Sequence, residues 1–260
     1  MRKLGLSTCI VLAALSVAVV ARAAPLDDNA ERYRSLMIES IGESLTGARA
    51  LRDRVAANDV DGAKRAWISA RAGWERSEVF TAGSVPELDA MIDAWPNATS
   101  GFHAIEARLF GAGRIDVADD ADQLVGHLDD LHQRLRNMQL SPQGVLAGTV
   151  RLAYEVGESK ADGGESRISG TSLDDIRNNV AGIDLAYQTV FADQLKAVAP
   201  RLAEIVTDRI TRLKTTVAAP DLPHVDVTAL RRASEELVVA LQDASARLGL
   251  VRPTLEALAQ

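Results

Sequence analysis

Long stretches rich in alanine, leucine, arginine and glutamate are the feature that most limits what this chain can fold into. These residues favour helices, whereas glycine and proline, which weaken or interrupt helices, are sparse. Runs of alternating β-branched residues, which are typical of strands, are missing. We therefore predict an all-α protein, built as one or more antiparallel helical bundles with short connections.

Apolar periodicity and local capping signals set the expected helix boundaries. Apolar residues recur on one face of the first predicted helix, at Tyr33, Met37, Ile41 and Leu45. A serine followed by a proline at 141–142 is typical of a helix start. We expect helices over residues 28–57, from 59 or 61 to 80, 88–92, 100–110, 117–138, 141–160, from 171 with a break at 200, and 227–248, with a turn at 83–86.

The first 23 residues are predicted to be a signal peptide. Arg2 and Lys3 precede a mostly apolar run over residues 4–20, and Ala21-Arg22-Ala23 matches the small-x-small pattern that signal peptidase cleaves. An uncleaved membrane anchor is the alternative, which the shortness of the apolar run disfavours. Residues 24–260 are then expected to form the helical domain of an exported protein.

The only cysteine, Cys9, lies inside the predicted signal peptide. The exported domain would therefore enter an oxidising compartment with no disulfide framework, and its stability has to come from a hydrophobic core. Thiolate metal sites and a disulfide-linked partner are excluded in the same way.

The charge of the chain is acidic. Loss of Arg2, Lys3 and Arg22 with the signal peptide would take the formal charge from −7 to −10. Such a protein repels nucleic acid and anionic lipid and attracts cations. Because no basic stripe is present, we expect no nucleic-acid partner.

Acidic and histidine side chains at helical spacing are the candidates for chemistry. Glu75 and Glu78 are three residues apart, as are His103 and Glu106, and positions i and i+3 share one face of a helix. Two such helices facing each other would bring four donors together, as in the carboxylate metal sites of helical bundles. Asp89 and Asp93, four residues apart, lie between the two pairs in the sequence and could supply a further oxygen.

Ion pairing is the competing interpretation of these residues. Acid pairs at this spacing are common in a chain with 36 acidic residues, and most of them are solvated. Around both candidate pairs, however, the neighbouring residues are apolar, so their charges need an opposite charge or a cation. The opposite charges could come from the nearby arginines Arg71, Arg76 and Arg108.

Motifs of well-known enzyme classes are absent from the sequence. It contains no G-x-S-x-G, no Walker loop, no dinucleotide fingerprint and no H-E-x-x-H. The His103 segment is not an inverted zincin motif, because residue 107 is alanine.

The segment 101–106, Gly-Phe-His-Ala-Ile-Glu, resembles the G-x-H-x-x-E signature of the imelysin-like superfamily. The blocks at 74–78, 92–96 and 169–179, with Gly182 following, also look like blocks of that family. The resemblance extends from about residue 30 to residue 215. It implies an imelysin-like fold of helical bundles, with a metal site near the His-x-x-Glu motif.

The resemblance also implies a set of metal ligands. Carried over by motif position, they are Glu75, Glu78, Asp93, His103 and Glu106, and Glu165 matches a further acidic family position less closely. The chain departs from the pattern at Gly170, where the iron-uptake members tend to have a histidine. Its length resembles the short form of the family, without a cupredoxin-like domain.

Iron uptake is the function that the resemblance favours. The superfamily includes periplasmic iron-uptake proteins of the EfeO and EfeM type, imelysin itself, first described as a peptidase, and alginate-binding relatives. We expect a periplasmic protein that binds iron, with zinc or copper as other metals, and passes it to an inner-membrane iron permease or other uptake component. A metallopeptidase and a polysaccharide-binding protein are the alternatives, and the aromatic content of 4% disfavours the second.

Overall fold

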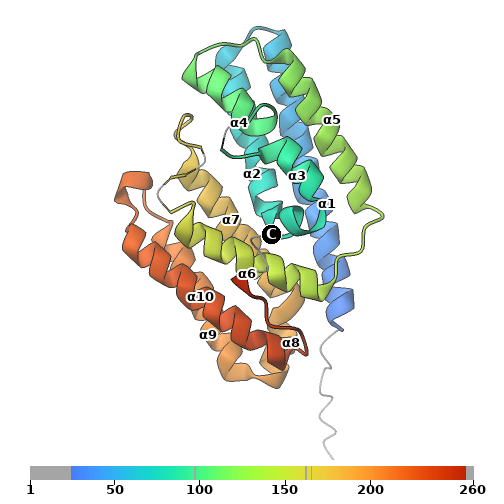
Figure 1. Cartoon of the computed structure of the whole chain (residues 1–260), viewed down its shortest axis with the longest axis vertical. Helices are drawn as coiled ribbons and strands as arrows, with labels where there is room; N and C mark the ends of the chain where they lie inside the picture. The colour runs from blue at the N-terminus through green and yellow to red at the C-terminus, as the bar shows by residue number, and fades with distance from the viewer. Residues whose placement is uncertain (1–24, 97, 162, 165, 256–260) are drawn as a thin grey trace, which may run out of the picture.

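The computed structural model describes residues 25–96, 98–161, 163–164 and 166–255. All regular secondary structure in these residues is helical, which confirms the predicted all-α class. The helices α1 to α5 form one half of the molecule and α6 to α10 form the other (Figure 1). The predicted signal peptide, residues 1–23, lies outside the described residues. Within them, no helix is both long and apolar enough to cross a membrane.

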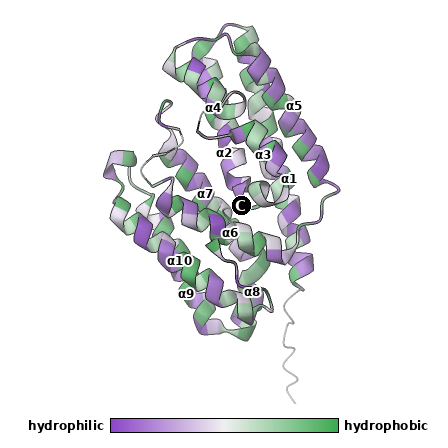
Figure 2. Cartoon of the chain, viewed as in Figure 1, coloured by the Kyte–Doolittle hydropathy of each residue, from purple (hydrophilic) through white to green (hydrophobic). Residues whose placement is uncertain are grey.

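The first half is built on three long helices. α1 (Leu26–Ala56) packs along α2 (Val60–Ser84) and also against α5 (Ala118–Leu135). The apolar stripe predicted on α1 is buried in the core. The Asp59 carboxylate accepts a 2.9 Å hydrogen bond from the Gly62 N–H and caps α2, which begins near the predicted residue 59 or 61. The outer side of α5 carries mainly hydrophilic residues (Figure 2).

Two short helices connect α2 to α5. The predicted end of α2 at Phe80 was wrong, because α2 continues to Ser84 and Pro86 then begins α3 (Pro86–Asp93). The helix expected over residues 100–110 is α4 (Gly101–Glu106), which continues into the π-helical turn η1 (Ala107–Gly111). Gly101 begins α4 with a φ of +73°, a conformation that suits glycine.

The second half contains the remaining helices. α6 (Pro142–Glu158) is capped by Ser141, and α7 (Ser172–Ala186) begins close to the predicted residue 171. α7 continues through the π-helical turn η2 (Tyr187–Phe191) into α8 (Ala192–Val198), which the sequence did not predict as separate elements. After the expected break come α9 (Pro200–Thr216), the 3₁₀ turn η3 (Leu222–His224) and α10 (Val227–Arg247).

Two glycines let the halves approach each other closely at α2. A Cβ atom on Gly148 of α6 would lie 1.6 Å from the Val79 carbonyl oxygen, and one on Gly182 of α7 would lie 2.4 Å from the Arg76 carbonyl oxygen. Any larger residue would therefore push the helices apart. α6 and α7 thus pack against the part of α2 that carries Glu75 and Glu78.

Candidate metal centre

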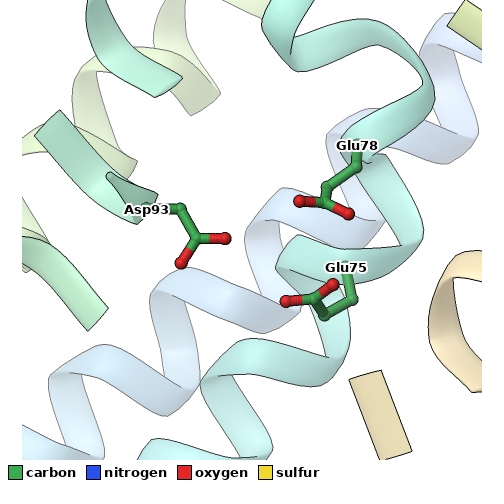
Figure 3. Close-up of side chains that lie close together, drawn as sticks. All are labelled: Glu75, Glu78 and Asp93. Atoms are coloured by element: carbon green, nitrogen blue, oxygen red, sulfur yellow. The ribbon is translucent and has the colours of Figure 1, made fainter. Parts of the chain in front are cut away.

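Three acidic side chains meet between α2 and the end of α3 (Figure 3). Glu75 and Glu78 lie on the same face of α2, and Asp93 is the last residue of α3. One carboxylate oxygen from each of the three lies within 4.8 Å of the others. Their side chains are 0%, 14% and 5% exposed, respectively, so they form an almost buried acidic cluster.

The imidazole of His103 lies between the carboxylates of Asp93 and Glu106. Its Nε2 atom is 3.2 Å from Asp93 Oδ1, and its Nδ1 atom is 3.1 Å from Glu106 Oε2. Nε2 is buried, and within the described residues it has no partner in hydrogen-bond geometry. Glu106 is fixed from its other side, because the Ser169 N–H and hydroxyl donate to its Oε1 at 2.8 and 2.7 Å. The half-exposed indole of Trp95 packs on the His103 ring, with centroids 5.0 Å apart.

A buried arginine joins the acidic cluster to α7. The guanidinium of Arg71, which is 1% exposed, is ion-paired with Glu75 one turn further along α2. It also lies 2.5 Å from Asp93 Oδ1 and 3.1 Å from Asp175 Oδ2. Ion pairing with Arg71 was the alternative to a metal site in the sequence analysis, and the structure contains that ion pair.

The other two arginines named with Arg71 pair elsewhere. Arg76 contacts Glu43 and lies 3.4 Å from the side-chain oxygen of Asn178. Arg108 lies 2.5 Å from Asp120. Their ion pairs therefore do not explain the burial of Glu75 or Glu106.

The two glutamates of α2 also bind groups from the second half of the molecule. The Lys160 ammonium lies 2.9 Å from Glu78 Oε2 and 3.5 Å from Glu75 Oε2. The side-chain amide of Asn179 donates to the Glu75 backbone carbonyl and to both carboxylates, at 3.0, 2.8 and 2.6 Å. Both glutamates are thus held in position by α7 and by the turn that follows α6.

Burial and ion pairing shift the pKa values of the cluster in opposite directions. Burial raises the pKa of Glu75 to about 7, and Arg71 offsets only part of that rise. Asp93 is also buried, but Arg71 and His103 outweigh the burial and hold its pKa well below the usual range. For His103, the carboxylates of Asp93 and Glu106 outweigh burial and raise the pKa to about 9. At neutral pH the imidazole is therefore protonated.

The donor set fits a hard or borderline cation. Carboxylate oxygens with an imidazole nitrogen are ligands that suit iron, manganese and zinc. The buried cations at this site are Arg71, Lys160 and protonated His103. They are outnumbered by the acidic groups they contact, which are Glu75, Glu78, Asp93, Glu106 and Asp175. A cation would therefore reduce an excess of buried negative charge.

The structure brings together only some of the residues that the resemblance implied as ligands. Glu75, Glu78 and Asp93 form one cluster, and His103 contacts Asp93. Glu106 contacts the other ring nitrogen of His103, where it is placed to orient the imidazole. Glu165 lies outside the described residues.

The sequence analysis did not predict several residues at this site. The Trp74 indole N–H donates to Asp93 Oδ2 at 2.7 Å. Asn179 and Lys160 contact the glutamates, whereas Asp175 pairs with Arg71. Asp175 and Asn179 could have been found, because they are four residues apart on a predicted helix and so share a face. Nothing in the sequence around Lys160 indicated a buried ammonium, because its position depends on how the second half of the chain packs on α2.

These features define the class: an all-helical protein with a buried cluster of carboxylates, histidine, arginine and lysine where its two halves meet. The chain belongs to the imelysin family, since the family model Peptidase M75, Imelysin, matches residues 30–100 and 96–248. The comparison thereby confirms the resemblance inferred from the segment 101–106.

Relatives of known name agree with this assignment. The iron uptake system component EfeO of Escherichia coli O157:H7 is 30% identical over 196 residues, which cover 72% of this chain and 52% of the relative. The protein of the same name from Escherichia coli strain K12 is 29% identical over the same shares of both chains. The chain therefore spans about half the length of the curated relatives it matches.

A solved structure shares the fold. It comes from Parabacteroides distasonis ATCC 8503 and carries the name iron-regulated protein A precursor. The TM-score is 0.70 at 16% sequence identity, and the match covers 88% of this chain and 97% of the other. At this identity the likeness supports the helical architecture alone.

Proposed function

We propose that this chain is a periplasmic metal-binding protein of an iron-uptake system, which binds iron as cargo at the cluster around Glu75. One observation carries the proposal: three carboxylates from two helices lie within 4.8 Å of one another, almost buried and beside a histidine. Such a cluster alone adds little to the stability of the fold, because replacing buried charges by apolar groups is often neutral or stabilising.

Each residue has a distinct role in this proposal. Glu75, Glu78 and Asp93 supply oxygen ligands, and Nε2 of His103 supplies nitrogen. Glu106 accepts the proton on Nδ1 and so selects the tautomer whose Nε2 is free, as carboxylates behind metal-bound histidines commonly do. Because this imidazole is protonated in the metal-free protein, binding a metal ion releases its proton.

Iron is proposed as the metal on the strength of the relatives. The matched relatives are named as components of an iron uptake system, and the donor set suits ferrous or ferric iron. Zinc and copper are the other metals considered. The partner would be an inner-membrane iron permease or another component of the uptake system, to which the ion is handed on.

Isothermal titration with ferrous, ferric, zinc and cupric ions tests the proposal. We expect about one ion per chain, and Asp93→Asn and His103→Gln each to weaken binding by at least about 10–100-fold, the range typical of a disturbed metal site. Glu87→Gln is the matched control, because Glu87 lies on α3, as Asp93 does, but pairs with Arg134 at the surface. Equal affinity in all four proteins would refute the site.

A further inference from the structure

The ammonium of Lys160 already occupies part of the candidate metal centre. It lies 2.9 Å from Glu78 Oε2 and 3.5 Å from Glu75 Oε2, and these two side chains supply two of the three clustered carboxylates. Its side chain is only 5% exposed. An incoming metal ion therefore meets glutamates whose negative charge is already partly compensated by a cation from the protein.

Lys160 is better placed to leave than the other buried cation. Arg71 lies in the middle of α2 and is held by three carboxylates from three helices. Lys160 lies just beyond the end of α6 at Glu158, and its single ammonium is carried on a flexible four-carbon stem.

We propose that Lys160 is an exchangeable counter-ion: a divalent metal ion replaces its ammonium at Glu75 and Glu78, and the ammonium returns when the ion leaves. The inference rests on the proposed function. The exchange makes and breaks only ionic contacts, so it involves no covalent or redox step. Lys160 holds the acidic cluster together in the metal-free protein, and by competing for the same oxygens it lowers the affinity for metal and speeds release.

A neutral replacement measures the competition directly. In isothermal titration with Mn²⁺ and with Zn²⁺, we expect Lys160→Met to bind about tenfold more tightly than the unchanged protein, with slower loss of metal to a chelator. Lys214→Met is the matched control, since Lys214 is 54% exposed and lies 2.8 Å from Asp184, so its loss removes the same charge from a solvent-exposed ion pair. The control should bind within about twofold of the unchanged protein, because exposed charges are screened by salt.

A second measurement uses the unchanged protein and so does not depend on the folding of a variant. Lysine side chains are acetylated with an activated ester, with and without Zn²⁺, and the modified positions are quantified by mass spectrometry. Metal should raise the labelling of Lys160 severalfold and leave that of Lys214, which is 54% exposed, unchanged. Labelling of Lys160 that does not respond to bound metal would overturn the exchange.

The outcomes separate this inference from the function on which it rests. If the unchanged protein and Lys160→Met bind metal equally, or if Lys160→Met binds more weakly, the exchange is wrong and the metal site stands. If neither protein binds Mn²⁺ or Zn²⁺, the exchange fails, and the titrations with ferrous and ferric ions decide the metal site. If only Lys160→Met binds, the competition is stronger than proposed and the exchange is supported.

Discussion

The same pair of residue types, at the same spacing, occurs in two opposite environments in this molecule. Arg71 and Glu75 of α2 are four residues apart and ion-paired, and their side chains are 1% and 0% exposed. Arg232 and Glu236 of α10 are also four apart and ion-paired, but their side chains are 79% and 26% exposed. Both pairs follow the helical i,i+4 rule equally well.

The difference lies in what surrounds each pair. The α2 pair is enclosed by α3, α6 and α7, so Arg71 must also neutralise Asp93 and Asp175. The α10 pair faces solvent, which screens its charges. Helical spacing thus identifies residues that can interact, whereas tertiary packing decides whether their interaction matters for stability and binding.

Removing the arginine of each pair should give the largest contrast. We expect Arg71→Met to lower the free energy of unfolding by about 3–5 kcal/mol, because it leaves three carboxylates buried without their guanidinium. Arg232→Met should change it little. Urea unfolding followed by circular dichroism measures both variants. Added Zn²⁺ should restore part of the stability lost in Arg71→Met. Equal stability of the two variants would show that Arg71 does not stabilise the buried carboxylates.

The pH dependence of stability should report the buried region rather than the surface. The raised pKa values of Glu75, about 7, and His103, about 9, mean that the folded protein holds protons that the unfolded chain releases from 4.5 and 6.5 upward. The free energy of unfolding of the metal-free protein should therefore fall as pH rises from 5 to 9, by about 3 kcal/mol from each of the two groups. Glu236 does not contribute in this range, since its pKa is lowered by its hydrogen bond to Arg232.

Urea unfolding at a series of pH values checks this expectation. Glu75→Gln should flatten the dependence, because the variant has no carboxyl group to titrate at that position. A stability that rises steadily from pH 5 to pH 9 in the metal-free protein would contradict the raised pKa values.

The close contact of α7 with α2 should give a smaller effect. We expect Gly182→Ala to lower the free energy of unfolding by about 1–2 kcal/mol, because its Cβ would lie 2.4 Å from the Arg76 carbonyl oxygen. Gly126→Ala on α5 is the matched control: nothing lies within 4 Å of its Cβ, so the better helix propensity of alanine should stabilise the protein by about 0.5–1 kcal/mol. A stabilising Gly182→Ala would show that the two helices have room to separate.

The sequence predicted the helices better than the cluster. Helix formers, Asp59 and the serine–proline pair at 141–142 are local signals, and the helices they predicted are present. The π-helical turns at 107–111 and 187–191 were not predicted, since nothing in the local sequence distinguishes them from α-helix.

The candidate site was predictable only where its members share a helix. The pairs Glu75–Glu78 and His103–Glu106 followed from spacing. The meeting of Asp93 with both glutamates depends on the chain reversal between α2 and α3, and the contact with Lys160 depends on α6 packing on α2. Such contacts between distant segments carry no periodic signal in one sequence.

The side-chain amide of Asn179 has a consequence for how this protein opens. It holds the backbone carbonyl of Glu75 together with both α2 carboxylates, so α7 cannot separate from α2 without releasing all three groups at once. Local unfolding of this helix pair and loss of the binding site are therefore one event. Backbone amides at 75–79 and at 179–183 should exchange their hydrogens in step, and a bound ion should slow both sets together.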